Sequence, residues 1–290
     1  MKIKKYNLVN NLKFILFILL NIIFISNNCF SNTLFEKDRP LTNEKYDFVK
    51  INLLSGNKYL SNQSTLLAGI QVKLSPGWKI YWRNPGDAGL PPEVDWKNSN
   101  NIKSFKLLFP TPKRFSFYEI ETLGYEKEVI FPLEIEMVDK DKNLSGILEF
   151  NAQICSKICV PVKKVFNLSN LETNSLSNSF FKKIERFKST VPVIVKDDKL
   201  KLLSFNYKDK KLHLVLSQQF DLKPIDIIIE DEKGVIYSKP DFYSNQDLMY
   251  ISINIKNTKL DNKNFHLTFL GKDSSFEKSI IIKNIIKSDL

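Results

Sequence analysis

The chain has 290 residues, which is enough for a leader segment and two globular domains. Its hydrophobic content of 43% is ordinary for a globular protein. The formal net charge of +11 is spread along a chain rich in Lys, Asn and Ile, without a dense Lys/Arg cluster and interleaved aromatic residues. This distribution argues against a nucleic-acid-binding surface.

The N-terminus has the three parts of a bacterial secretory signal peptide. A basic segment, MKIKKYNLVNNLK, precedes the apolar run FILFILLNIIFI at residues 14–25. Cys29 and Ser31 then supply the small residues that precede a cleavage site. The apolar run is short for a membrane span, which needs about 20 residues. We therefore expect residues 1–31 to be removed and the mature protein to be periplasmic, with an uncleaved membrane anchor as the alternative.

Residues 32–172 are predicted to form a β-sandwich. Short segments of alternating apolar and polar residues are separated here by turn residues such as Ser75-Pro76-Gly77, and no amphipathic helix interrupts them. This pattern is typical of an antiparallel sandwich. Pro132 marks its segment as an edge strand or a bulged one. The predicted strands are residues 47–53, 66–74, 105–109, 129–137, 147–154 and 160–166.

A linker with a short helix is predicted over residues 173–192. Its first part is rich in Asn and Ser. Four apolar residues then recur at the spacing of an amphipathic helix, namely Phe180, Phe181, Ile184 and Phe187. We expect this helix to pack between two domains.

Residues 193–290 are predicted to form a second, smaller β-sandwich. Residues 212–216 and 251–255 alternate with the period of a half-buried strand. A turn at residues 230–234 predicts a hairpin whose second strand is residues 235–237. The fold class is therefore all-β.

The sequence contains no signature of a cofactor site. There is no P-loop, no dinucleotide-binding fingerprint and no Gly-x-Ser-x-Gly nucleophile elbow. The two histidines, His213 and His266, fall on the expected polar faces of strands. We therefore expect no cofactor and no resident metal.

Cys155 and Cys159 are the only cysteines outside the leader, and they flank the turn of a predicted hairpin. In an oxidising compartment they most simply pair with each other. A bond across so short a loop stabilises a protein by only about 2 kcal/mol, and a chain of this length does not depend on it. Lys157, between the two sulfurs, would favour a thiolate. The residues leave three alternatives open: a redox-active pair, a structural disulfide and a two-cysteine copper or zinc site.

Three stretches, read together and in order, carry a family resemblance. They are PGWKIYWRNPGDAGLPPEVDW at residues 76–96, FPTPKRFSFYEIETLGYEKEVIFPLEI at residues 109–135, and CSKICVP at residues 155–161. Residues 46–171 thereby resemble the N-terminal periplasmic domain of the DsbD/ScsB thiol:disulfide interchange proteins. The Cys-x-x-x-Cys-Val-Pro spacing points to the ScsB-like branch.

The resemblance implies that the first domain is an immunoglobulin-like β-sandwich with one redox cysteine pair on a hairpin, and we expect the chain to form two immunoglobulin-like β-sandwich domains joined by the linker. By motif, Cys155 and Cys159 match the reactive pair. Family members cap the disulfide with an aromatic loop, for which the candidates here are Phe115, Phe117 and Tyr118. Tyr81 matches an aromatic strand beside the hairpin, and Lys157 is a supporting residue.

The resemblance also implies partners. The membrane-embedded and thioredoxin-like domains of full-length family members are absent from this sequence. We therefore expect a stand-alone monomer, a component of a protein-disulfide reductase, whose electron donor is a membrane-embedded protein of the DsbD, ScsB or CcdA type. Its acceptors would be periplasmic thioredoxin-like proteins, in cytochrome c maturation or copper tolerance. The alternatives are a non-enzymatic adaptor with a structural disulfide and a copper-binding protein.

Overall fold

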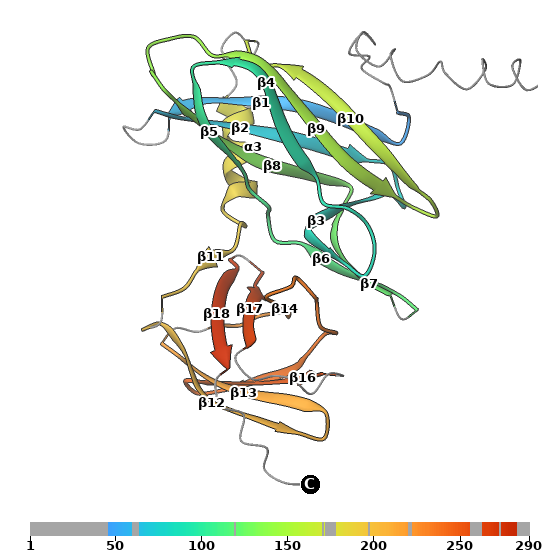
Figure 1. Cartoon of the computed structure of the whole chain (residues 1–290), viewed down its shortest axis with the longest axis vertical. Coiled ribbons are helices and arrows are strands. Elements are labelled where there is room, and N and C mark those ends of the chain that lie inside the picture. The colour runs from blue at the N-terminus through green and yellow to red at the C-terminus, as the bar shows by residue number, and fades with distance from the viewer. Residues whose placement is uncertain are drawn as a thin grey trace, which may run out of the picture. The chain divides into compact units, whose positions relative to one another are not determined.

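The computed structural model of the protein describes residues 46–59, 64–118, 120–169, 171, 178–196, 198–219, 222–255, 263–272 and 274–282 (Figure 1). The predicted signal peptide and most of the Asn/Ser-rich part of the linker lie outside these ranges. The described part consists of strands and one helix, so the predicted all-β fold class is confirmed. In this part of the chain, no helix combines the length and the apolar character that crossing a bilayer requires.

The first sandwich has two sheets whose apolar faces meet around fully buried side chains such as Ile70, Trp82, Phe131 and Phe150. The first sheet has the order β1-β2-β8-β5, with β1 (Val49–Tyr59), β2 (Thr65–Leu74), β8 (Glu128–Met137) and β5 (Ile102–Leu107). The second has the order β10-β9-β3-β7-β6, with β10 (Cys159–Asn167), β9 (Ser145–Cys155), β3 (Lys79–Gly86), β7 (Ile120–Glu126) and β6 (Lys113–Phe117), while β4 (Glu93–Asn100) also pairs with β9.

The six strands predicted for this region correspond to β1, β2, β5, β8, β9 and β10, but the expectation for Pro132 is wrong. β8 is an inner strand, and Pro132 lies opposite Gly69 of β2. The Pro132 carbonyl accepts a hydrogen bond from the Leu108 N–H, just beyond the end of β5. Because the nitrogen and the carbonyl of one strand residue point to the same side, the missing N–H faces the end of β5 and costs no bond to β2.

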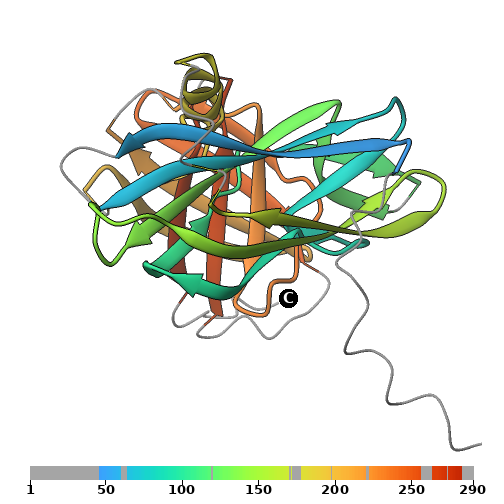
Figure 2. The ribbon, with the colours of Figure 1, turned by 90° about the horizontal axis from the view of Figure 1, so that it is seen from above.

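Helix α3 (Asn178–Lys188) covers the outer face of the first sheet (Figures 1 and 2). Ile184 is fully buried against Leu67 and Ile130, which point away from the sandwich core. A Cβ atom on Gly69 would lie 2.8 Å from Ile130 and 3.0 Å from Ile184, so the glycine allows the helix to approach. The helix therefore packs on the first sandwich, and the expectation that it packs between two domains is wrong. β2 and β8 carry apolar side chains on both faces, so the outer face of their sheet has to be covered as well.

The second sandwich is formed by two four-stranded sheets around a core that includes Leu214, Ile251 and Phe265. One sheet has the order β11-β18-β17-β14, with β11 (Val193–Ile194), β18 (Phe276–Ile282), β17 (Lys263–Leu270) and β14 (Asp226–Asp231). The other has the order β12-β13-β16-β15, with β12 (Leu200–Lys208), β13 (Lys211–Gln218), β16 (Leu248–Asn254) and β15 (Asp241–Asn245).

The predicted hairpin of the second sandwich is only partly formed. β14 pairs along its length with β17, which is distant in sequence. The segment after the turn contributes a single bridge, between Glu230 and Ile236. Residues 235–237 are therefore not a strand, although they follow the free edge of β14, where the Tyr237 N–H donates a hydrogen bond of 3.0 Å to the Ile229 carbonyl.

Two arginines of the first sandwich bind acidic side chains of the second. Arg83 Nη2 lies 2.9 Å from Glu230 Oε2. Arg114 Nε lies 2.8 Å from Asp226 Oδ2, and Arg114 Nη1 lies 2.7 Å from Glu121 Oε2 of the neighbouring strand. The Arg114 and Asp226 side chains are only 7% and 11% exposed. Arg114 therefore connects β6 to both β7 and β14 through charge-assisted hydrogen bonds that water screens little.

Replacing Arg114 by Met should destabilise the protein by about 3 kcal/mol, because Asp226 would keep a covered carboxylate without a cation. Urea denaturation measures the change. The control is Lys113→Met, which removes the exposed pair with Glu126 at 2.9 Å and should cost less than about 1 kcal/mol. If the two substitutions lowered the free energy of unfolding equally, the covered pair of Arg114 and Asp226 would stabilise the protein no more than an exposed pair, which would contradict this account.

Candidate functional site

The cysteine pair lies at the end of the hairpin formed by β9 and β10. Side chains alternate between the two faces of a strand, so Phe150 and Ile154 of β9 point into the core while Cys155 points to the outer face. The register of the two strands sets Cys155 directly opposite Cys159. A hydrogen bond of 2.9 Å from the Ser156 N–H to the Ile158 carbonyl closes the turn between them.

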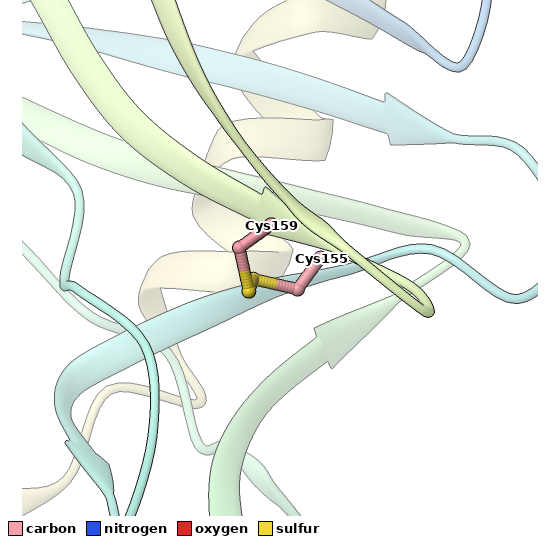
Figure 3. Close-up of a disulfide and its surroundings, with 2 residues drawn as sticks. All are labelled: Cys155 and Cys159. Atoms are coloured by element: carbon pink, nitrogen blue, oxygen red, sulfur yellow. A yellow bond between two sulfur atoms is a disulfide. The ribbon is translucent and has the colours of Figure 1, made fainter.

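The two cysteines form a disulfide, with their Cα atoms 4.1 Å apart. Figure 3 shows the bond at the base of the turn. The two residues differ in exposure, since Cys155 is 5% exposed whereas Cys159 is an exposed residue. An incoming molecule therefore reaches this bond from the Cys159 side.

Lys79 is the residue that neighbours Cys155 on the other side of β9. The first residues of β3 pair with β9, and their register sets Lys79 directly opposite Cys155. Directly opposed residues share a face, so Lys79 and Cys155 both lie on the outer face of the sheet. The Lys79 ammonium lies 4.1 Å from the centroid of the Phe115 ring of β6. Sequence reasoning missed Lys79, although the alternation of Lys79 and Tyr81 with the buried Ile80 would have placed it on this face.

The predicted cap-loop residues separate into two groups. Phe115 is half-buried and contacts Lys79. Phe117 and Tyr118 lie at the tip of the β6–β7 hairpin, where they are 70% and 91% exposed. Their ring centroids are 4.7 Å apart, so they contact each other. The structure thus sets Phe115 against Lys79 and leaves the other two rings in solvent.

The other two predicted site residues also differ in their surroundings. Lys157 is exposed in the turn. Tyr81 is 5% exposed, and burial raises the pKa of its hydroxyl. Tyr81 therefore forms part of the packed support of the site, whereas Lys157 is open to solvent.

The Pro-Gly-Asp-x-Gly-Leu-Pro-Pro motif forms a loop that covers Tyr81. Gly89 has a φ of +100°, and a Cβ atom there would lie 2.3 Å from the Tyr81 ring. Asp87 fixes the loop to β7, because its carboxylate accepts a hydrogen bond of 2.8 Å from the Glu121 N–H and its own N–H donates one of 2.9 Å to the Glu121 carbonyl. Asp87 is thus more than a turn former, since it joins this loop to the β6–β7 hairpin.

The described residues contain no group of three or more His, Cys, Asp or Glu side chains that could hold a metal ion. The cysteine pair thus has no further ligand of these types near it in the described part. Zn²⁺ bound by the reduced pair would need additional ligands from a partner or solvent, whereas the two thiolates are ligands that suit Cu(I).

Replacing Gly89 by Ala should destabilise the protein by about 2 kcal/mol, because the methyl group meets the Tyr81 ring and the backbone keeps a conformation that L-residues avoid. Urea denaturation measures this loss. Combining Gly89→Ala with Tyr81→Leu should recover part of it, since the ring is then absent. Ala88→Ser, at the exposed neighbouring position, should change stability by less than about 0.5 kcal/mol, and a similarly small effect of Gly89→Ala would contradict this account.

Comparisons with known proteins agree with this geometry. Residues 53–170 match the family model described as "Thiol:disulfide interchange protein DsbD, N-terminal". The structure is similar to that of the N-terminal periplasmic domain of ScsB from Proteus mirabilis, with 25% sequence identity, a TM-score of 0.63, and coverage of 82% of this chain and 95% of that chain.

A second solved structure, the DsbD N-terminal domain of Neisseria meningitidis in the reduced form, shares 11% identity with a TM-score of 0.26 and covers 40% of this chain and 82% of that chain. A comparison with individually curated protein sequences gave no match.

Proposed function

We propose that the chain passes reducing equivalents to partner proteins through the Cys155–Cys159 pair. The match of residues 53–170 to the DsbD N-terminal family model and the similarity to the ScsB domain support this proposal. The observation that carries the proposal is a disulfide at the end of a hairpin with one exposed cysteine. Such a short loop contributes only about 2 kcal/mol of stability. Stabilisation is therefore a weak reason for the bond, whereas exchange requires the access that Cys159 provides.

The exchange begins at Cys159. A thiolate of the electron donor attacks the Cys159 sulfur, because thiol–disulfide exchange needs an in-line approach to the attacked sulfur. The bond between Cys155 and Cys159 breaks, its electron pair stays on Cys155 as a thiolate, and the donor is left in a mixed disulfide with Cys159. A second donor thiolate then releases Cys159, so the pair becomes reduced and the donor oxidised.

Delivery of the electrons runs through the same atoms in reverse. The Cys159 thiolate attacks the disulfide of an acceptor and forms a mixed disulfide. Cys155 then attacks Cys159, which restores the original bond and releases the reduced acceptor. The exposure of Cys159 and the burial of Cys155 support this division into an attacking and a resolving cysteine.

The partners follow from the family. The donor is a membrane-embedded protein of the DsbD, ScsB or CcdA type, and the acceptors are thioredoxin-like proteins in the periplasm, in cytochrome c maturation or copper tolerance. Phe117 and Tyr118 stand in solvent beside the site. A cap formed by these two rings would therefore require the tip of the β6–β7 hairpin to close over the disulfide.

Peptide mapping should locate the mixed disulfide at Cys159. The oxidised protein is mixed with a thioredoxin variant that lacks its resolving cysteine, and the linked peptides are identified by mass spectrometry. We expect the link to Cys159 to exceed the link to Cys155 by about tenfold, because burial excludes the thioredoxin thiolate from Cys155. Chains that lack the leader and carry Cys155→Ser or Cys159→Ser have one thiol each, and activating that thiol as a thionitrobenzoate disulfide before the thioredoxin variant is added confirms the peptide assignments.

Absence of any mixed disulfide would contradict exchange itself. Equal amounts at both cysteines would contradict only the assignment of Cys159 as the attacked residue.

The reduction potential of the pair separates exchange from a structural disulfide. Equilibration in glutathione buffers should give a value above about −300 mV, the range in which partner thiols reduce a bond. A lower value would favour a structural bond in a non-enzymatic adaptor. The copper-binding alternative is tested on the reduced protein, which should take up no stoichiometric Cu(I).

A further inference from the structure

The exchange proposed above leaves a negative charge on a poorly exposed atom. Each cycle passes through a Cys155 thiolate, and Cys155 is 5% exposed. Burial disfavours the charged form of a thiol, and a cation close to the sulfur opposes that effect. A domain that uses Cys155 as its leaving and resolving group therefore needs a positive charge on the same face of the sheet.

Lys79 meets this requirement by its position. It lies directly opposite Cys155 in the pairing of β3 with β9. Directly opposed residues in antiparallel strands have Cβ atoms about 4.5–5.5 Å apart on one face of the sheet. The flexible lysine side chain can therefore carry its ammonium from its present place to the Cys155 sulfur.

The charge of Lys79 is available because the nearby carboxylate already has a partner. On its other side Lys79 lies opposite Glu126 of β7. The Glu126 carboxylate is bound by Lys113 at 2.9 Å, and this hydrogen bond is the main reason why its pKa is lowered, with only a minor contribution from Lys79. Among the described residues Lys79 forms no ion pair, and its ammonium lies over the Phe115 ring instead.

We propose that Lys79 stabilises the Cys155 thiolate during exchange, and that the Phe115 ring holds the Lys79 ammonium as a charged amine while the bond is intact. When a partner thiolate attacks Cys159, the electron pair of the broken bond moves to Cys155, and Lys79 turns from the ring to this new anion. Phe115 holds a protonated amine through a cation–π contact without neutralising it. Lys79 and Phe115 are thus positioning residues, and the proposal rests on the exchange function stated above.

The test measures the ionisation of Cys155 directly. In a reduced chain with Cys159→Ser, the ultraviolet absorbance of the thiolate is followed against pH, and the leader is removed so that Cys155 is the only thiol. Adding Lys79→Met should raise the Cys155 pKa, whereas Lys79→Arg, which keeps the charge, should leave it near that of the parent. Phe115→Leu should not raise it, because removing the ring removes the cation–π contact that competes with the thiolate for the ammonium.

Kinetics give a second readout in the chain with both cysteines. Reduction of the oxidised protein by dithiothreitol at neutral pH should be about three- to tenfold slower with Lys79→Met, because the leaving thiolate is less stable. The matched control is Lys106→Met, which removes an exposed lysine from β5 in the opposite sheet and should change neither readout. Near-ultraviolet circular dichroism checks the folding of each variant, and Lys79→Gln replaces Lys79→Met if the latter does not fold.

The outcomes separate this inference from the function on which it rests. An unchanged Cys155 pKa in Lys79→Met or Lys79→Gln would overturn the role of Lys79, even if the wild-type chain forms its mixed disulfide at Cys159. An equal shift in Lys157→Met would overturn the assignment to Lys79, because the turn lysine would then supply the charge. A wild-type chain that forms no mixed disulfide would instead overturn the exchange function itself.

Discussion

The antiparallel register of β9 and β10 is the constraint on which the site depends. It sets Cys155 opposite Cys159 and turns both toward the outer face of the sheet. A slip of one residue would send one strand's side chains to the other face. The register is fixed because Phe150, Ile154 and Val162 of these strands are buried in the core and cannot exchange places with their polar neighbours. The packing of the sandwich therefore determines the chemistry available at its surface.

The same alternation arranges the surroundings of the disulfide. β3 sends Ile80 into the core and turns Lys79 and Tyr81 to the face that carries Cys155. The loop that follows β3 closes over Tyr81 and is bonded to β7 through Asp87. The β6–β7 hairpin is thus bonded to this loop at Glu121, one residue pair from its tip, while the aromatic rings of the tip remain in solvent.

The second sandwich stabilises the strands of the cysteine-bearing sheet through ion pairs. Its acidic side chains bind Arg83 at the far part of β3 and Arg114 beside Phe115. Both arginines lie a few residues from groups that surround the disulfide. Removing one partner of a covered ion pair is strongly destabilising because it leaves an unpaired charge. The second sandwich therefore fixes β3 and β6 of the sheet that carries the disulfide.

The sequence by itself determined the all-β fold, the hairpin with its two cysteines and the family resemblance, because alternation, turn residues and motif order are local properties of the chain. Only the tertiary structure decided which strands are neighbours. It set Lys79 beside Cys155, buried Cys155 while exposing Cys159, placed α3 on the outer face of a sheet and made the strand with Pro132 an inner one. The physical reason is that a period of two defines the faces of a strand but not its partners, and strand pairing joins residues that are far apart in sequence.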